Sequence, residues 1–99
     1  MFISLPEAGH DYGFGHITRQ CVFINLLRKF GLEAYLTLPN NLVGKKDIVG
    51  KLLSGRLEKK YLLSYHEVKY IITSRRVDIK LIIDSYDYKS NLRAIDIKP

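Results

Sequence analysis

The pattern of apolar and polar positions alternates along the chain between short continuous runs and helical spacing. Continuous apolar runs bounded by turn-forming residues are typical of strands. Such runs occupy Phe2–Leu5, Ala34–Leu38, Leu57–Leu63 and Ile79–Ile83. We therefore expect four strands. The last run contains Leu81-Ile82-Ile83, the kind of sequence found in a parallel strand that is buried on both faces of its sheet.

Apolar residues at helical spacing fill the segments between these runs. After the first run, apolar side chains recur every three or four residues up to Gly31, which predicts an amphipathic helix with a glycine stop. The stripe consists of Ile17, Cys21, Ile24, Leu27 and Phe30. Two further helices are predicted at Asp47–Leu53 and Tyr65–Arg76.

Alternating strands and helices predict an α/β domain whose strands pair in parallel through right-handed crossovers. At 99 residues the chain has room for one small domain, 1–99. Ligands of open α/β sheets bind beyond the carboxyl ends of the strands. The loop Glu7–Gly15 follows the first strand and Asp84-Ser85-Tyr86 follows the last. We therefore expect these two segments to meet at one edge of the sheet.

The net charge of +6 arises entirely after Gly44, where the basic residues come in pairs. The pairs are Lys45-Lys46, Lys59-Lys60 and Arg75-Arg76. Net charge alone influences solubility and weak non-specific binding, and it does not identify a defined partner. We interpret the pairs as solvated helix faces and loop ends, and we do not expect a nucleic acid as the partner.

The single cysteine excludes an internal disulfide and a cysteine-rich metal site. Cys21 falls in the apolar helical stripe, so we expect a buried structural thiol. No apolar run approaches the roughly 20 residues of a membrane span, and the first residues lack the basic and apolar segments of a signal peptide. We expect a cytoplasmic protein.

The sharpest chemical signal is the glycine loop before the first helix, with Gly13, Gly15 and His16. Backbone N–H groups and a helix N-terminus meet there, and together they can bind an anion. Histidine also exchanges a proton near neutral pH. The alternatives are structural: the glycines serve a tight turn with positive φ, and His16 caps its helix. Arg19 can either reach a phosphate or form a surface salt bridge.

A metal site is not expected. His10, Asp11 and His16 are the nearest candidates, and their spacing fits no established pattern of metal ligands. We also expect no cofactor.

Two segments carry a resemblance to a known family. Tyr12-Gly13-Phe14-Gly15-His16-Ile17-Thr18-Arg19 resembles the glycine–histidine loop of the UDP-sugar hydrolase of pseudaminic acid biosynthesis. That family is related to spore-coat polysaccharide biosynthesis proteins and to GT-B nucleotide-sugar glycosyltransferases. Leu81-Ile82-Ile83-Asp84-Ser85-Tyr86 is similar to the strand of the family that ends in Ile-Ile-Asp-x-Tyr. The resemblance implies a Rossmann-like three-layer domain with a small, mainly parallel sheet, like part of the N-terminal domain of the GT-B fold.

The resemblance also implies a function, namely hydrolysis of UDP from a UDP-linked amino sugar. His16 matches the histidine that acts as a base on water. The substrate-binding positions implied are Gly13, Phe14, Gly15, Arg19, Asp84 and Tyr86. Two departures concern the identity of the substrate. Leu5-Pro6-Glu7 replaces an Arg-x-Asp sequence, and Asp87 replaces a glycine.

The family has a second Rossmann-like domain that holds most of the uridine nucleotide. The chain is therefore expected to be an incomplete domain that contacts the UDP-sugar through its sugar moiety. It would need a complementary C-terminal domain chain or self-association, and it would be inactive alone. Two alternatives stay open. One is a fragment of a GT-B glycosyltransferase, and the other is a non-catalytic binding or assembly module that has kept the fold.

Overall fold

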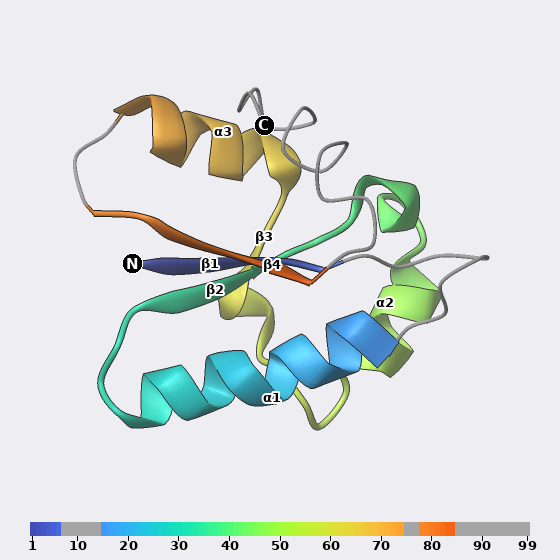
Figure 1. Cartoon of the computed structure of the whole chain (residues 1–99). Helices are drawn as coiled ribbons and strands as arrows, with labels where there is room; N and C mark the ends of the chain where they lie inside the picture. The colour runs from blue at the N-terminus through green and yellow to red at the C-terminus, as the bar shows by residue number, and fades with distance from the viewer. Residues whose placement is uncertain (7–14, 75–77, 85–99) are drawn as a thin grey trace.

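The computed structural model describes residues 1–6, 15–74 and 78–84. They form four strands, three α-helices and two short 3-10 helices (Figure 1). In chain order these are β1 Phe2–Pro6, α1 Gly15–Lys29, β2 Ala34–Thr37, η1 Asn40–Leu42, α2 Lys46–Leu53, η2 Lys59–Tyr61, β3 Leu62–Leu63, α3 Tyr65–Ser74 and β4 Lys80–Asp84. None of these helices is long and apolar enough to cross a membrane.

The four strands form one sheet in the order β3-β2-β1-β4, and every pairing is parallel. In Figure 1, α3 covers one face of the sheet, while α1 and α2 cover the other. This is the parallel α/β domain expected from the alternating pattern, and it is a small Rossmann-like domain, as the resemblance implies. All four strands end on the same side, which we call the carboxyl edge. The residues there are Pro6, Thr37, Leu63 and Asp84.

Residue parity decides which face of the sheet each side chain joins, because successive residues of a strand point to opposite faces. Ile3 and Leu5 of β1 are completely buried and pack with Val68 of α3. Ser4 lies between them in sequence and points to the opposite face, where its hydroxyl meets Gln20 of α1. The sheet therefore separates two apolar cores, one against α3 and one against α1 and α2.

The helix α1 follows its predicted stripe and ends as predicted. Ile17, Cys21 and Ile24 are buried against the sheet, and burial raises the pKa of the Cys21 thiol. Gly31 adopts a left-handed φ of 81°, and the Leu32 amide donates to the Leu27 carbonyl, which is the geometry of a glycine C-cap.

Two expectations about the apolar runs are wrong. Phe30, placed as the last residue of the apolar helical stripe, lies in the turn beyond the last residue of α1 and is 74% exposed. The run Leu57–Leu63 forms a strand only at Leu62–Leu63. Three consecutive charged residues, 58–60, interrupt that run, and charged side chains are rarely accommodated inside a buried parallel strand. Leu57 instead packs into the core beside α1 and α2.

The strand β4 is also less buried than its sequence predicts. Leu81, Ile82 and Ile83 are only half-buried, whereas we expected them to be covered on both faces. In the described part of the chain, β4 lies at one end of the sheet and pairs only with β1. Its five-residue register with β1 is nevertheless the longest in the sheet, and it places Asp84 opposite Pro6 at the carboxyl edge.

Candidate functional site

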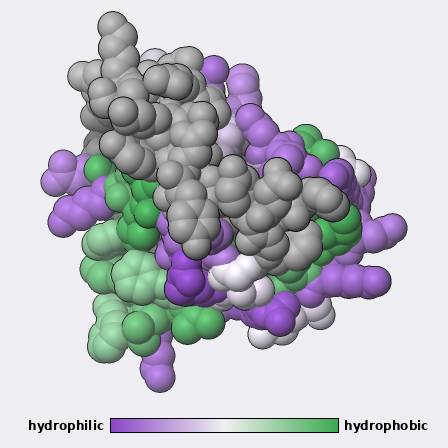
Figure 2. All heavy atoms as spheres, turned by 45° about the vertical axis from the view of Figure 1, so that its right-hand side comes forward, coloured by the Kyte–Doolittle hydropathy of each residue, from purple (hydrophilic) through white to green (hydrophobic). Residues whose placement is uncertain are grey.

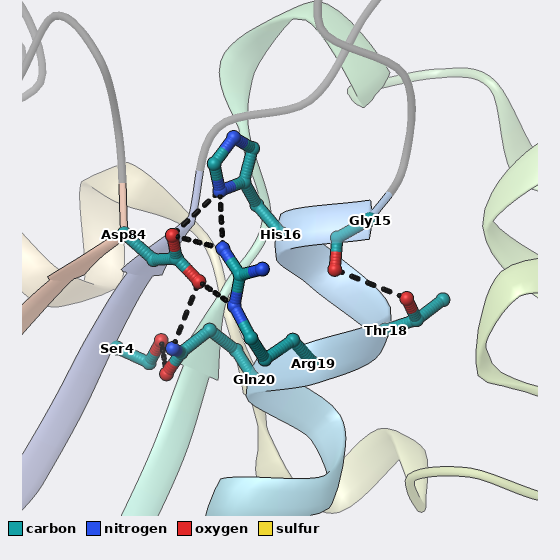
Figure 3. A network of polar contacts seen from close by, with 7 residues as sticks. All are labelled: Ser4, Gly15, His16, Thr18, Arg19, Gln20 and Asp84. Atoms are coloured by element: carbon teal, nitrogen blue, oxygen red, sulfur yellow. Dashed lines mark hydrogen bonds and ion pairs between the residues drawn. The ribbon is translucent and has the colours of Figure 1, made fainter.

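The candidate site forms where the end of β4 meets the first turns of α1. Parity turns Asp84 toward α1, because Leu81 and Ile83 pack on the α3 side of the sheet. On α1, the residues His16, Arg19 and Gln20 stand at positions i, i+3 and i+4, so they share one face of the helix. All three side chains reach the Asp84 carboxylate (Figure 3).

Arg19 forms a two-point ion pair with Asp84. Its Nε donates to Oδ2 at 2.9 Å, and one terminal guanidinium nitrogen donates to Oδ1 at 2.6 Å. Planar two-point contacts of this kind fix the orientation of a carboxylate as well as its charge. Gln20 adds a third hydrogen bond, from its amide nitrogen to Oδ2 at 3.1 Å. The carboxylate of Asp84 is therefore held from two sides.

The pKa of Asp84 reflects these contacts. Burial by itself raises the pKa, but the hydrogen bonds from Arg19, His16 and Gln20 outweigh it and lower the pKa from 3.8 to about 2. Asp84 is consequently ionised at neutral pH, and it acts only as an acceptor.

An ionised carboxylate decides how the proton is placed on His16. The Nδ1 atom lies 2.5 Å from Asp84 Oδ1, a distance that requires Nδ1 to carry a hydrogen and to donate it. One terminal nitrogen of Arg19 also lies 2.9 Å from Nδ1. Because a guanidinium only donates, this contact and an Nδ1–H are alternatives, and the shorter contact with the ionised carboxylate favours the Nδ1–H form. In the neutral ring the basic nitrogen is then Nε2. Figure 3 shows Nε2 on the side of the ring that points away from the carboxylate. A carboxylate that fixes the tautomer of a histidine in this way is a recurrent support for a general base.

Two residues of this network, Ser4 and Gln20, were not predicted from the sequence. The completely buried Ser4 hydroxyl donates to the Gln20 carbonyl oxygen at 2.7 Å. This bond orients the Gln20 amide so that its nitrogen faces Asp84. The available signals were weak: Ser4 is a polar residue within a buried apolar run, and Gln20 follows His16 by one helical turn.

The predicted site residues are brought together in part. His16, Arg19 and Asp84 are in direct contact, and the salt bridge foreseen as one alternative for Arg19 is the one with Asp84. Gly15 is the first residue of α1 rather than a loop residue. A methyl group added at Gly15 would meet no described atom within 4 Å. Gly13, Phe14 and Tyr86 lie outside the described residues.

Within the described ranges, no three histidine, cysteine or carboxylate side chains converge in a way that could hold a metal ion. Separately, the contact of His16 with the ionised Asp84 carboxylate is an arrangement that can support proton transfer.

No protein-family model, curated protein or solved structure matches the chain. By its fold and its contacts it is a small Rossmann-like α/β domain with an aspartate–histidine pair at the carboxyl edge of a parallel sheet.

Proposed function

We propose that this domain forms the sugar side of a nucleotide-sugar site and that His16 activates water for hydrolysis of a UDP-linked amino sugar. The observation that carries the proposal is the 2.5 Å contact between His16 Nδ1 and Asp84 Oδ1. It presents Nε2 as the basic nitrogen of the neutral ring, at the edge where open α/β sheets bind ligands. The resemblance of the segments around both residues supplies the substrate class.

The reaction follows from this geometry. A water molecule held near Nε2 of His16 attacks the anomeric carbon of the sugar, and Nε2 accepts a proton from that water. The bond between the anomeric carbon and the diphosphate oxygen breaks, and UDP leaves with the electron pair. Asp84 remains ionised throughout and stabilises the imidazolium that forms. The products are the free amino sugar and UDP.

Arg19 acts in this proposal as a positioning residue, since its guanidinium is committed to Asp84 at two points. Gly15 leaves room for the substrate to approach the backbone closely, because no described side chain or backbone atom fills the space beside it. The proposal assigns most contacts with the uridine and the diphosphate to a second Rossmann-like domain, in the same polypeptide or in a partner.

The proposal is tested by measuring UDP release from UDP-linked N-acetylated amino sugars. The assay uses the protein as its native gene encodes it, so that any further domain is present. The test variant is His16→Asn, in which the side-chain amide occupies the region of Nδ1 while no atom replaces Nε2. His66→Asn is the matched control, because His66 is an exposed residue of α3.

We expect UDP release to fall at least about a hundredfold in His16→Asn, the usual contribution of a general base, and to be unchanged in His66→Asn. Full activity in His16→Asn contradicts the mechanism. UDP release that depends on an added sugar acceptor instead of water would indicate a glycosyltransferase. Binding of UDP-sugar without any turnover would indicate a non-catalytic module.

A further inference from the structure

We propose that a second pocket at the carboxyl edge, surrounded by Lys45, Lys46 and Lys59, binds the phosphate group of a small organic phosphate. The pocket has a volume of about 420 Å³. It opens where β2 and β3 end, since Leu38 and Ser64, the residues that follow these strands, both line it. The His16–Asp84 pair belongs instead to β4 and the start of α1. The inference rests on its own observations and is independent of the hydrolase proposal.

The charge of this pocket is one-sided. Three lysines from two separate segments line it, and none of its described lining residues is acidic. Among the residues that the structure describes, none of the three forms an ion pair. Their neighbour Lys60 differs, because it lies 3.4 Å from Glu58 and above the ring of Tyr61. We interpreted the two lysine pairs, Lys45-Lys46 and Lys59-Lys60, as solvated surface residues. Three of these four lysines line this one pocket.

The start of α2 adds to this positive potential. Gly44, with a φ of 83°, turns the chain into α2, and both Gly44 and the first residues of the helix line the pocket. No side-chain hydrogen bond caps the start of α2 at Lys45, and the acidic residue of the first turn, Asp47, does not line the pocket. By contrast, Ser64 and Glu67 cap α3 reciprocally through two hydrogen bonds. The N–H groups of an uncapped first turn and the helix dipole both favour an anion at this end of α2.

The remaining wall of the pocket is apolar and indicates an organic phosphate. Leu38, Leu42 and Val49 line it beside the lysines, so a ligand can place a carbon skeleton there and its phosphate near the ammonium groups. A nucleic-acid strand fits less well, because such partners require a basic track with aromatic residues for stacking. No aromatic side chain is among the lining residues that the structure describes.

The experiment is an NMR titration of the ¹⁵N-labelled chain with glucose 1-phosphate, inorganic pyrophosphate and, for comparison, a single-stranded oligonucleotide. Sodium chloride at matched ionic strength serves as the blank. We expect saturable shifts of the amides in 44–49 and at Ser64 with both phosphates. The variant Lys45→Gln/Lys46→Gln/Lys59→Gln should bind at least about tenfold more weakly, since hydrogen bonds to charged groups are lost.

The control variant, Lys29→Gln/Lys51→Gln/Lys60→Gln, removes the same charge from exposed lysines outside the pocket, and it should bind phosphate within about twofold of the wild type. Equal weakening in both triple variants overturns the proposal, as do the absence of saturation and shifts confined to 15–20. Tighter binding of the oligonucleotide than of both phosphates overturns it as well. His16→Asn should leave phosphate binding unchanged, which separates failure of this proposal from failure of the hydrolase proposal. If the pocket triple does not fold, Lys45→Gln and Lys59→Gln are tested singly against Lys51→Gln.

Discussion

Ser4 and Asp84 lie on different strands, and Gln20 bridges them: its oxygen accepts from the Ser4 hydroxyl, and its nitrogen donates to the Asp84 carboxylate. The Gln20 amide thus links the buried strand β1 to the carboxylate at the end of β4, and Ser4 fixes the orientation of that amide. Ser4→Ala should leave the side-chain oxygen of Gln20, a residue that is 93% buried, without the hydroxyl that donates to it. We expect a loss of roughly 1–2 kcal/mol in the free energy of unfolding. Chemical denaturation measures it.

Ser74→Ala is the control for that change, because the exposed Ser74 hydroxyl donates locally, to the Ile71 carbonyl of its own helix. Its effect should be within about 0.5 kcal/mol. Equal losses in the two variants would contradict the ordering role of Ser4.

The stability of the domain should depend on acid through Asp84. Its pKa is lower in the folded state, about 2 instead of 3.8, so its stabilising contribution is complete above pH 3.8 and is lost as the pH falls through about 2. We expect roughly 1–2 kcal/mol to disappear in this window, a range discounted because Arg19 is largely exposed. Urea unfolding of the wild type and of Asp84→Asn at several pH values measures it. An equally steep loss in Asp84→Asn would show that another group is responsible.

The tautomer of His16 should depend on Asp84. In the wild type we expect the neutral ring to carry its hydrogen on Nδ1, because that atom donates to an ionised carboxylate at 2.5 Å. In Asp84→Leu this acceptor is gone, and the population should shift toward the Nε2–H form. Two-bond ¹H–¹⁵N spectra of the imidazole distinguish the forms. A neutral wild-type ring that carries its hydrogen on Nε2 would refute the assignment of Nε2 as the base.

Arg19→Lys should separate charge from geometry. Lysine keeps the positive charge but cannot reproduce the two parallel contacts to Oδ1 and Oδ2. We expect the pKa of Asp84 to rise and stability to fall by less than about 1 kcal/mol, because Arg19 is 62% exposed. Carboxyl ¹³C titration by NMR follows the pKa directly. An unchanged pKa would mean that the two-point geometry contributes nothing.

Two glycines should respond to alanine in opposite directions. Gly31→Ala introduces a side chain at a φ of 81° and should destabilise the domain by about 1 kcal/mol, although no described atom blocks the space. Gly50→Ala replaces a glycine inside α2, where φ is ordinary and the space is also open, and it should stabilise by about 0.5–1 kcal/mol. Thermal or urea unfolding of both variants tests the pair. The same sign in both would contradict this assignment of backbone conformation.

Sequence patterns predicted the alternating elements, the parallel sheet and the placement of the His16 segment and Asp84 at one edge of it, because periodicity and chain topology determine these features. The direct contacts of His16 and Arg19 with Asp84 were not predicted. The patterns did not predict the shortness of β3, since the charged residues 58–60 override the apolar residues that flank them. They also missed Ser4 and Gln20, whose roles depend on the register of β1 against β4 and on the rotation of α1. Neither quantity can be read from one strand or one helix alone.

The parity of β4 has a consequence for how such a site can change over time. Asp84 faces α1 only because it is an odd number of residues from Leu81 and Ile83, which face α3. Insertion or deletion of a single residue between them and Asp84 would send the carboxylate to the opposite layer, away from His16, while the residues themselves remained. A chain that keeps this chemistry must therefore preserve the phase of its last strand as strictly as the identity of the acid. Insertion of two residues before Asp84 would keep the carboxylate on the α1 side of the sheet, whereas insertion of one residue would not.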